Sequence, residues 1–293
     1  MNVLTVPNWS FGRERNLLRQ VVDRLEEHVG AVHYAQADID HNRTVTAFSG
    51  EPEEVKKTLL DLARLILPSI NLQRHSGCHP RIGGLDVCPF IPVSRDFNAE
   101  TLTGWIESIA KKFAEEFDVP TFLYEKSERG THASDLPTLR KGGFGGLLAR
   151  ELSPDFGPKQ AHPYLGATVM GWRDFLIAFN INFQSEDLES VQRIAQKIRA
   201  LRREKDPRYI GVRALGFALP SQGLVQVSMN VTQPDKTPLD PIIESVTFMA
   251  EKYGLHNGYV QLIGVIRDVD VEHSVLVPFR PEQVIVTRQG VNP

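Results

Sequence analysis

The sequence predicts an α+β fold of two split β-α-β units, because the same order of strand and helix patterns occurs in each half of the chain. The chain has 293 residues, of which 41% are hydrophobic, enough for one large core or two modest ones. A long connection at residues 125–165, rich in glycine, proline and charge, precedes the second half. We therefore expect two domains, residues 1–168 and residues 169–293.

The first half begins with a short apolar strand at residues 3–6. An amphipathic helix is predicted at 16–29, where apolar side chains recur at helical spacing and Gly30 follows. Further along this half, the patterns predict strands at 31–35 and 44–48, a helix at 52–67, a strand at 87–93, a helix at 102–117 and a strand at 121–124.

The same kind of order returns in the second half. The patterns predict a strand at 175–183, a helix at 186–201, strands at 212–219 and 224–231, a helix at 239–253 and a strand at 259–266. No element is predicted after Asp268. Both halves thus fit the split β-α-β, or ferredoxin-like, order of elements.

Residues 74–93, RHSGCHPRIGGLDVCPFIPV, place the titratable side chain of His79 in a loop. Pro80 biases the backbone of His79 towards an extended conformation, and Gly77, Gly83 and Gly84 allow the chain to approach a ligand closely. This is how a catalytic side chain is presented on a loop. We therefore expect His79 to carry chemistry.

A metal site in this loop is the weaker interpretation. His75 and His79 have the spacing of a helical zinc pair, but Gly77 and Pro80 oppose the helix that would align them. Cys78 and Cys88 form no CxxC pair, and two cysteines in a chain of this length indicate a reducing compartment. We expect neither a metal nor a disulfide.

Charge and hydropathy exclude other classes of function. The chain has 33 Lys and Arg against 36 Asp and Glu residues, so its net charge of −3 argues against nucleic acid as a partner. No apolar stretch is long enough to span a bilayer, and the first residues show no basic region followed by an apolar run. A cytoplasmic protein without a membrane partner is expected.

Eight short strings, in this order and at compatible spacings, resemble those of the formiminotransferase family. They are VPNWS at 6–10, NRTV at 42–45, GCHPRIGGLDVCPFIPV at 77–93, LPTLRKG at 136–142, PDFGP at 154–158, GAT at 166–168, FLIAFNIN at 175–182 and QVSMN at 226–230. The resemblance covers nearly the whole chain. It does not extend to the helical cyclodeaminase domain that some relatives append, which we do not expect here.

This resemblance implies a fold and an activity. Its members pack two such sheets face to face with the helices outside, and folate lies between the sheets. They move a formimino group from N-formimino-L-glutamate to tetrahydrofolate, in histidine degradation and one-carbon metabolism. Tetrahydrofolate is then a co-substrate, no metal or redox cofactor is required, and a homodimer is the natural expectation.

The reaction requires a base and cations. Histidine titrates near neutral pH, so His79 is the expected base, with Asp86 as a partner that orients it or stabilises its charge. Arg43 and Arg81 are the best placed to grip substrate carboxylates, with Arg140 and Lys141 as second-rank alternatives. The alternative for each of these cations is an ordinary solvent-exposed charge that binds no ligand.

Folate-binding residues follow from the resemblance and from polar strand positions. Lys159 and His162 are expected to meet the glutamyl tail, and Gly157 and Pro158 to shape the wall. Besides Arg43 and Arg81, the predicted binding residues are Asn42, Gly157, Pro158, Lys159, Gln160, Ala161, His162, Pro163, Tyr164, Leu165, Gly166, Asn180, Asn182 and Asn230. Asn180 and Asn182 share one strand face, as do Gln226, Ser228 and Asn230, although a face hydrogen-bonded to water or to another sheet fits the pattern equally well.

Two departures from the family pattern leave the one-carbon donor open. Cys78 stands where the family usually has glutamate, and Phe11 follows Ser10 in place of another carboxylate. A paralogue acting on another one-carbon folate, such as 5-formyl-tetrahydrofolate, and a folate-binding protein with little catalysis are the alternatives.

Overall fold

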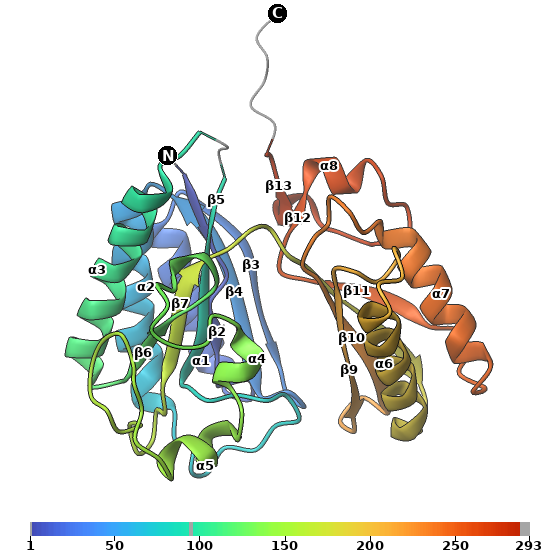
Figure 1. Ribbon diagram of the computed structural model, residues 1–293, viewed down its shortest axis with the longest axis horizontal. Helices are drawn as coiled ribbons and strands as arrows, with labels where there is room; N and C mark the ends of the chain where they lie inside the picture. Colours follow the sequence, from blue (N-terminus) through green and yellow to red (C-terminus); the bar gives the residue numbers. More distant parts are fainter. Residues whose placement is uncertain (1, 94–95, 288–293) are drawn as a thin grey trace, which may run out of the picture. The chain divides into compact units, whose positions relative to one another are not determined.

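The computed structural model describes residues 2–93 and 96–287, and the chain divides into two compact units, Met1–Arg173 and Asp174–Pro293 (Figure 1). The division follows Arg173, whereas the sequence placed it after residue 168. Both units combine helices with sheets, so the predicted α+β class is confirmed. No helix in the described part of the chain is long and apolar enough to cross a bilayer.

The first unit contains one seven-stranded sheet with the order β1-β4-β2-β5-β7-β6, and β3 pairs with β4. Its strands are β1 (Val3–Thr5), β2 (Asn8–Trp9), β3 (Ala31–Asp38), β4 (Arg43–Gly50), β5 (Leu85–Pro92), β6 (Thr121–Leu123) and β7 (Thr168–Trp172). The pairs β5–β7 and β6–β7 are parallel, and the other pairs are antiparallel. The hairpin of β3 and β4 places Asp38 opposite Arg43, so its turn is residues 39–42.

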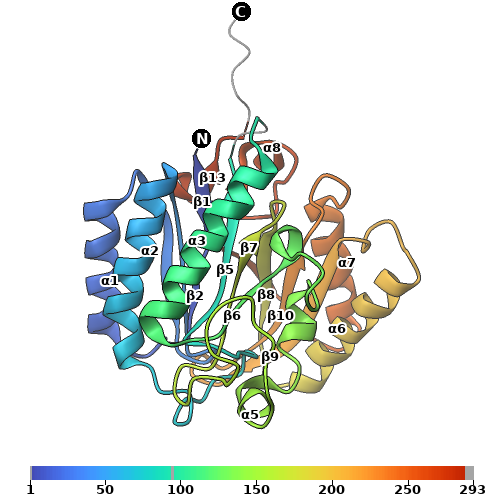
Figure 2. The same ribbon diagram turned by 60° about the vertical axis from the view of Figure 1, so that its left-hand side comes forward.

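Three helices cover one face of this sheet: α1 (Arg15–His28), α2 (Pro52–Ile66) and α3 (Ala99–Phe117) (Figure 2). The apolar side chains of α2 recur at helical spacing, at Val55, Leu59, Leu62 and Ile66, and all four are fully buried. Pro52 occupies the first turn of α2, where its missing N–H costs no hydrogen bond. These helices pack with Cys88 and Met170 of the sheet in the main hydrophobic core.

The long connection between β6 and β7 packs on the opposite face of the same sheet. It contains the short elements η2 (Glu125–Ser127), α4 (Leu136–Leu139) and α5 (Gly143–Leu148). Leu139 and Leu147 of this segment form a second apolar cluster with Val87 and Val169 of the sheet. The next residues along these strands, Cys88 and Met170, belong to the main core. Because side chains alternate along a strand, the two clusters lie on opposite faces.

The second unit has a four-stranded antiparallel sheet with the order β11-β8-β10-β9. Its elements are β8 (Ile177–Gln184), α6 (Leu188–Arg203), β9 (Val212–Leu219), β10 (Leu224–Val231), α7 (Leu239–Glu251) and β11 (Tyr259–Ile263). Beyond β11, β12 (Ile266–Arg267) pairs in parallel with β13 (Val284–Ile285), and α8 (Asp268–Val271) and η3 (Pro281–Gln283) lie between them.

Most predicted helices and strands are present within a few residues of their expected ends. The strands β9 and β10 begin and end at the predicted residues. The sequence missed β2 and β7, and it placed no element in the segment after Asp268, where the structure has α8 and β13.

Replacing Gly104 by alanine and replacing Gly83 by alanine should have opposite effects on the stability of the first unit. Gly104 lies inside α3, and a Cβ atom there would have no neighbour within 4 Å, so Gly104→Ala should stabilise by about 0.5–1 kcal/mol through its backbone entropy. A Cβ atom on Gly83 would lie 2.1 Å from the carbonyl oxygen of Ala167, so Gly83→Ala should destabilise by about 1–3 kcal/mol.

Urea unfolding followed by tryptophan fluorescence measures both effects, because Trp9, Trp105 and Trp172 all lie in the first unit. Equal midpoints for the two variants would contradict the packing described for Gly83.

Candidate active site

His79 lies in an irregular loop that precedes β5 and rests against the turn at residues 39–42. The N–H of Cys78 donates to the carbonyl oxygen of Asp40 over 3.1 Å. A Cβ atom on Gly77 would lie 2.3 Å from the carbonyl oxygen of His41, so only glycine allows this approach. The loop and the turn are therefore in direct contact.

The turn itself has a local cause in its sequence. The carboxylate of Asp38 accepts a hydrogen bond from the N–H of His41 over 2.7 Å, as aspartate does at the start of many turns. Asn42 has a φ of 45°, a left-handed conformation that asparagine tolerates better than most residues. Arg43 follows at the start of β4. The turn thus presents Asn42 and Arg43 to the His79 loop.

The imidazole of His79 is partly exposed and has a fixed tautomer. Its Nδ1 lies 2.8 Å from the carbonyl oxygen of Pro80, which can only accept, so the proton is on Nδ1 and the lone pair is on Nε2. The ring meets that of His41 edge to face, with 5.7 Å between their centroids. The geometry therefore gives His79 a proton acceptor at Nε2.

The surroundings of His79 favour its neutral form. Desolvation, followed by the positive charges of Arg43 and Arg140, holds the pKa of His79 well below its usual value of 6.5. An unprotonated imidazole is the form that can act as a general base. His79 is therefore available as a base at neutral pH.

Asp86 contacts a different partner from the one that the sequence suggested. Its Oδ1 accepts from the N–H of Ile82 over 2.7 Å, and its Oδ2 accepts from an η-nitrogen of Arg140. Both side chains of this ion pair are largely buried, at 4% exposure for Asp86 and 15% for Arg140. Neither of these bonds involves His79.

Three buried polar atoms around this loop have no hydrogen-bond partner among the described residues. They are Nε of Arg43, Nε of Arg140 and Oδ1 of Asn42, whose Nδ2 donates to the carbonyl oxygen of Ser76 over 3.0 Å. Buried polar atoms normally have partners, so unpaired ones indicate groups that a bound ligand or water would satisfy. Two guanidinium groups favour an anionic ligand.

The donors of Arg81 point to the protein. Its guanidinium donates to the carbonyl oxygens of His41 and Asn42 and twice to that of His79, and Nε2 of His75 lies 2.6 Å from one η-nitrogen and 3.0 Å from the carbonyl oxygen of Asn42. The sequence grouped Arg81 with Arg43 as carboxylate ligands. The structure instead places Arg81 between the turn and the His79 loop, while Arg43 and Arg140 keep unpaired nitrogens.

Cys78 and Phe11, the two departures from the family pattern, have no carboxylate-like role. Burial is the main cause that raises the pKa of the Cys78 thiol to about 11, so this residue is uncharged at neutral pH. Phe11 is 2% exposed and belongs to the main core of the first unit.

The expected folate stretch, residues 157–166, packs against the His79 loop. The carbonyl oxygens of Tyr164 and Leu165 accept from the N–H groups of Leu72 and Gly84, each over 2.8 Å. Nδ1 of His162 accepts from the N–H groups of Tyr164 and Leu165, and burial lowers the pKa of this ring. His162 therefore shapes its own turn, whereas Lys159 is exposed beside Glu151.

The remaining residues of this stretch differ in exposure. Ala161 is buried in the second apolar cluster, whereas Gln160, Pro163 and Tyr164 are exposed. Gly157 and Gly166 have positive φ angles of 88° and 69°. The stretch thus combines a backbone fixed at both ends with side chains that a ligand can reach.

In the second unit, the predicted amide face is present. Asn182 is opposite Gln226, and the amide nitrogen of Gln226 donates to Oδ1 of Asn182 over 2.8 Å. Asn180 is opposite Ser228, and Asn230, which is exposed, is opposite Ala178. The sequence missed Gln261, which is paired with Asn180 on the edge strand β11 and accepts from Asn182 over 3.4 Å. The alternation from Tyr259 to Gln261 was the available signal.

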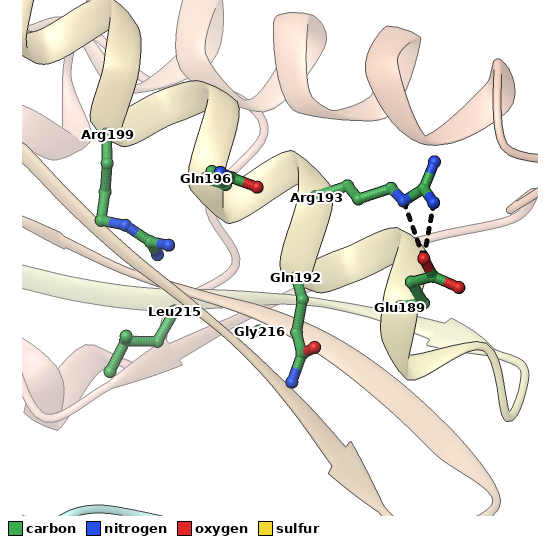
Figure 3. A pocket seen from close by; sticks show the side chains of 7 residues that line it. All are labelled: Glu189, Gln192, Arg193, Gln196, Arg199, Leu215 and Gly216. Carbon is green, nitrogen blue, oxygen red and sulfur yellow. Dashed lines mark hydrogen bonds and ion pairs between the residues drawn. The ribbon is translucent and has the colours of Figure 1, made fainter.

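A cavity of about 470 Å³ in the second unit contains none of the predicted site residues (Figure 3). It lies between α6 and the edge strand β9. Arg193 pairs with Glu189 over 2.5 Å, and Arg199 donates to the carbonyl oxygen of Ala214 over 2.8 Å. Arg193 and Arg199 thus already have partners within the unit. The loop of His79 is therefore the better candidate for an active site.

No group of three His, Cys, Asp or Glu side chains within residues 2–93 and 96–287 is arranged to hold a metal ion.

Removing Arg140 tests the electrostatics around His79. The positive charge of Arg140 lowers the pKa of His79, so Arg140→Gln should raise that pKa towards 6.5. A titration of the imidazole by ¹H–¹⁵N NMR measures the shift. Arg13→Gln, which removes an exposed arginine that is not among these charges, is the control and should leave the pKa unchanged. A lower pKa in Arg140→Gln would contradict this description.

Comparison with known proteins places the chain in a family. Residues 2–173 match the formiminotransferase domain, N-terminal subdomain, and residues 178–272 match the formiminotransferase domain. Glutamate formimidoyltransferases of Streptococcus pyogenes serotype M1 and Thermoplasma acidophilum are 30% and 32% identical over 89% of this chain and 87% and 86% of their own lengths. Formimidoyltransferase-cyclodeaminase of Sus scrofa is 37% identical over 89% of this chain, which spans about half, 49%, of that relative. The chain therefore belongs to the formiminotransferase family.

Proposed function

We propose that this protein transfers the formimino group of N-formimino-L-glutamate to N5 of tetrahydrofolate, releasing glutamate. The observation that carries the proposal is the placement of His79, whose Nδ1 lies 2.8 Å from the carbonyl oxygen of Pro80 and whose pKa is lowered by desolvation and by the charges of Arg43 and Arg140. The names of the two glutamate formimidoyltransferases, which match over most of their lengths, support the same reaction.

His79 would move both protons of this reaction. N5 of tetrahydrofolate attacks the formimino carbon, and Nε2 of His79 accepts the proton that N5 loses. The imidazolium that forms is a strong acid, because its surroundings favour the neutral ring. It therefore returns a proton to the nitrogen of glutamate as the carbon–nitrogen bond breaks. The cycle ends with a neutral His79 and requires no redox cofactor or metal.

Arg43 and Arg140 would bind the carboxylates of the substrates. Each has an unpaired Nε, and a guanidinium can hold a carboxylate through two parallel hydrogen bonds. Asp86 fixes Arg140 for this role. Oδ1 of Asn42 is a hydrogen-bond acceptor without a partner, which suits a donor such as the N–H of a formimino group better than a formyl oxygen.

Several finer assignments belong to the same proposal. We assign tetrahydrofolate as the co-substrate, residues 157–166 as its contact in the first unit, and the Asn182 amide face as a polar surface of the second. The strand order of the second unit supports a ferredoxin-like, split β-α-β arrangement. The domain limits at residue 168, face-to-face sheets, a homodimer and a cytoplasmic location stay predictions.

His79→Ala tests the reaction and its base together. Loss of a general base should lower kcat by about 10²–10⁴-fold, while folate binding, measured by calorimetry, is retained. The assay mixes the protein with N-formimino-L-glutamate and tetrahydrofolate and follows 5-formimino-tetrahydrofolate by absorbance. His273→Ala is a matched control, because His273 is an exposed histidine of the second unit. Absence of turnover in the unaltered protein would refute the proposed function.

The pH dependence of the wild-type reaction follows from the lowered pKa of His79. The base is active when unprotonated, so kcat/KM should fall on the acid side only as the pH drops through that pKa, which lies below 6.5. Initial rates across the acid range locate this limb. If kcat/KM instead falls at a pH above 6.5, and substitution of a residue other than His79 removes this fall, that other residue is the base.

A further inference from the structure

We infer that Arg81 is a positioning residue of this site, which sets the distance between the His79 loop and the turn that carries Arg43, and that it does not bind substrate. The inference rests on the proposed function, since it assigns a role within the same reaction. It also changes the role that the sequence suggested for Arg81, which was to grip a carboxylate.

The acceptors of Arg81 come from two separate segments. The carbonyl oxygens of His41 and Asn42 belong to the turn, and Asn42 receives its bond over 2.8 Å. The carbonyl oxygen of His79 and the ring of His75 belong to the loop, at 3.0 Å and 2.6 Å. One planar cation therefore joins the main chain of the turn to the main chain of His79 itself.

The geometry also explains why the cation is arginine. The guanidinium of arginine carries its donors on three nitrogens, so it can reach the turn and the loop at once. A lysine ammonium carries its three donors on a single nitrogen and cannot reach both segments. Gly77 leaves room for this guanidinium, because a Cβ atom on residue 77 would lie 2.7 Å from an η-nitrogen of Arg81. Burial is the main cause that lowers the pKa of His75 to about 4, followed by the charge of Arg81, so His75 adds no second positive charge beside the guanidinium.

The consequence for catalysis concerns distance. Arg43 follows Asn42 directly, and the carbonyl oxygen of His79 is fixed to the same guanidinium as that of Asn42. Removing Arg81 would let the imidazole move relative to the Arg43 cation. A displacement of about 1 Å in a catalytic group can lower a rate by about 10²-fold. The loss should appear in kcat, because the proposed carboxylate ligands Arg43 and Arg140 remain.

Steady-state kinetics of Arg81→Ala and Arg81→Lys separate positioning from binding. We expect kcat to fall by about 10²-fold in both variants, with little change in KM for either substrate. Added methylguanidinium should restore part of the kcat of Arg81→Ala, because it can refill the vacated site. A rise in KM for one substrate with kcat retained would overturn the inference.

Arg13→Ala is the matched control. Arg13 is an exposed arginine that contacts the same two segments, at the carbonyl oxygen of Ile39 and Oγ of Ser76, over 3.2 Å in each case. It donates to none of the acceptors of Arg81, so its removal should leave kcat and KM unchanged. A loss of kcat equal to that of Arg81→Ala would overturn the specific role of Arg81.

A second measurement keeps the inference testable if the Arg81 variants fail to fold or the wild type shows no turnover. The guanidinium of Arg81 donates to three main-chain carbonyl oxygens, so its N–H protons should exchange slowly with solvent. A ¹H–¹⁵N spectrum of the wild type should show these protected protons, and exchange as fast as that of the exposed Arg13 would overturn the inference. Absence of turnover with protected Arg81 protons would reject the proposed reaction alone.

His75→Gln and His75→Ala complete the kinetic test without altering Arg81. Glutamine has an acceptor for the guanidinium and donors for the carbonyl oxygen of Asn42, whereas alanine removes both contacts. We expect kcat to fall in His75→Ala and to recover in His75→Gln, with KM unchanged in both. An unchanged kcat in His75→Ala would contradict the role assigned to this contact.

Discussion

The hydrogen bonds around one guanidinium hold the candidate active site together. The turn between β3 and β4 and the loop before β5 are far apart in sequence, and neither contains regular secondary structure at the contact. Their carbonyl oxygens meet at Arg81, which donates a hydrogen bond to each of them. His79 on one side and Arg43 on the other therefore have defined positions.

A second ion pair completes this arrangement. Asp86 extends from the first part of β5 and holds Arg140, which lies at the end of α4 in the connection between β6 and β7. The connection is thereby tied to the sheet beside His79. The sheet supplies rigid strands and the irregular segments supply the candidate site residues, while desolvation and the charges of Arg43 and Arg140 lower the pKa of His79. The same positive charges suit anionic substrates.

Local patterns in the sequence predicted most of the fold. The helix α2 and the strands β9 and β10 have strong periodicity and clear boundaries, so their positions follow from neighbouring residues alone. The strand β7 is different, because it contains Gly171 and is stabilised by parallel pairing with β5 and β6 across a long stretch of chain. The strands β12 and β13 have two residues each, too few to give a periodic signal.

The site shows the same division between local and distant causes. The irregular loop that contains His79 could be predicted, because the glycines and prolines around this residue oppose regular secondary structure. The bond between Asp86 and Arg140 joins residues 54 positions apart, and that between Arg81 and His41 joins residues 40 positions apart. Such contacts depend on the folded chain, so the hydrogen-bond partners of Arg81 and Asp86 could not be predicted from the sequence alone.

The protonation state of His79 at neutral pH tests the central claim most directly. A ¹H–¹⁵N long-range spectrum of protein labelled at histidine distinguishes the two neutral tautomers from the imidazolium. We expect a neutral ring with its proton on Nδ1 and its lone pair on Nε2. An imidazolium at pH 7, or a proton on Nε2, would contradict the assignment of His79 as the base.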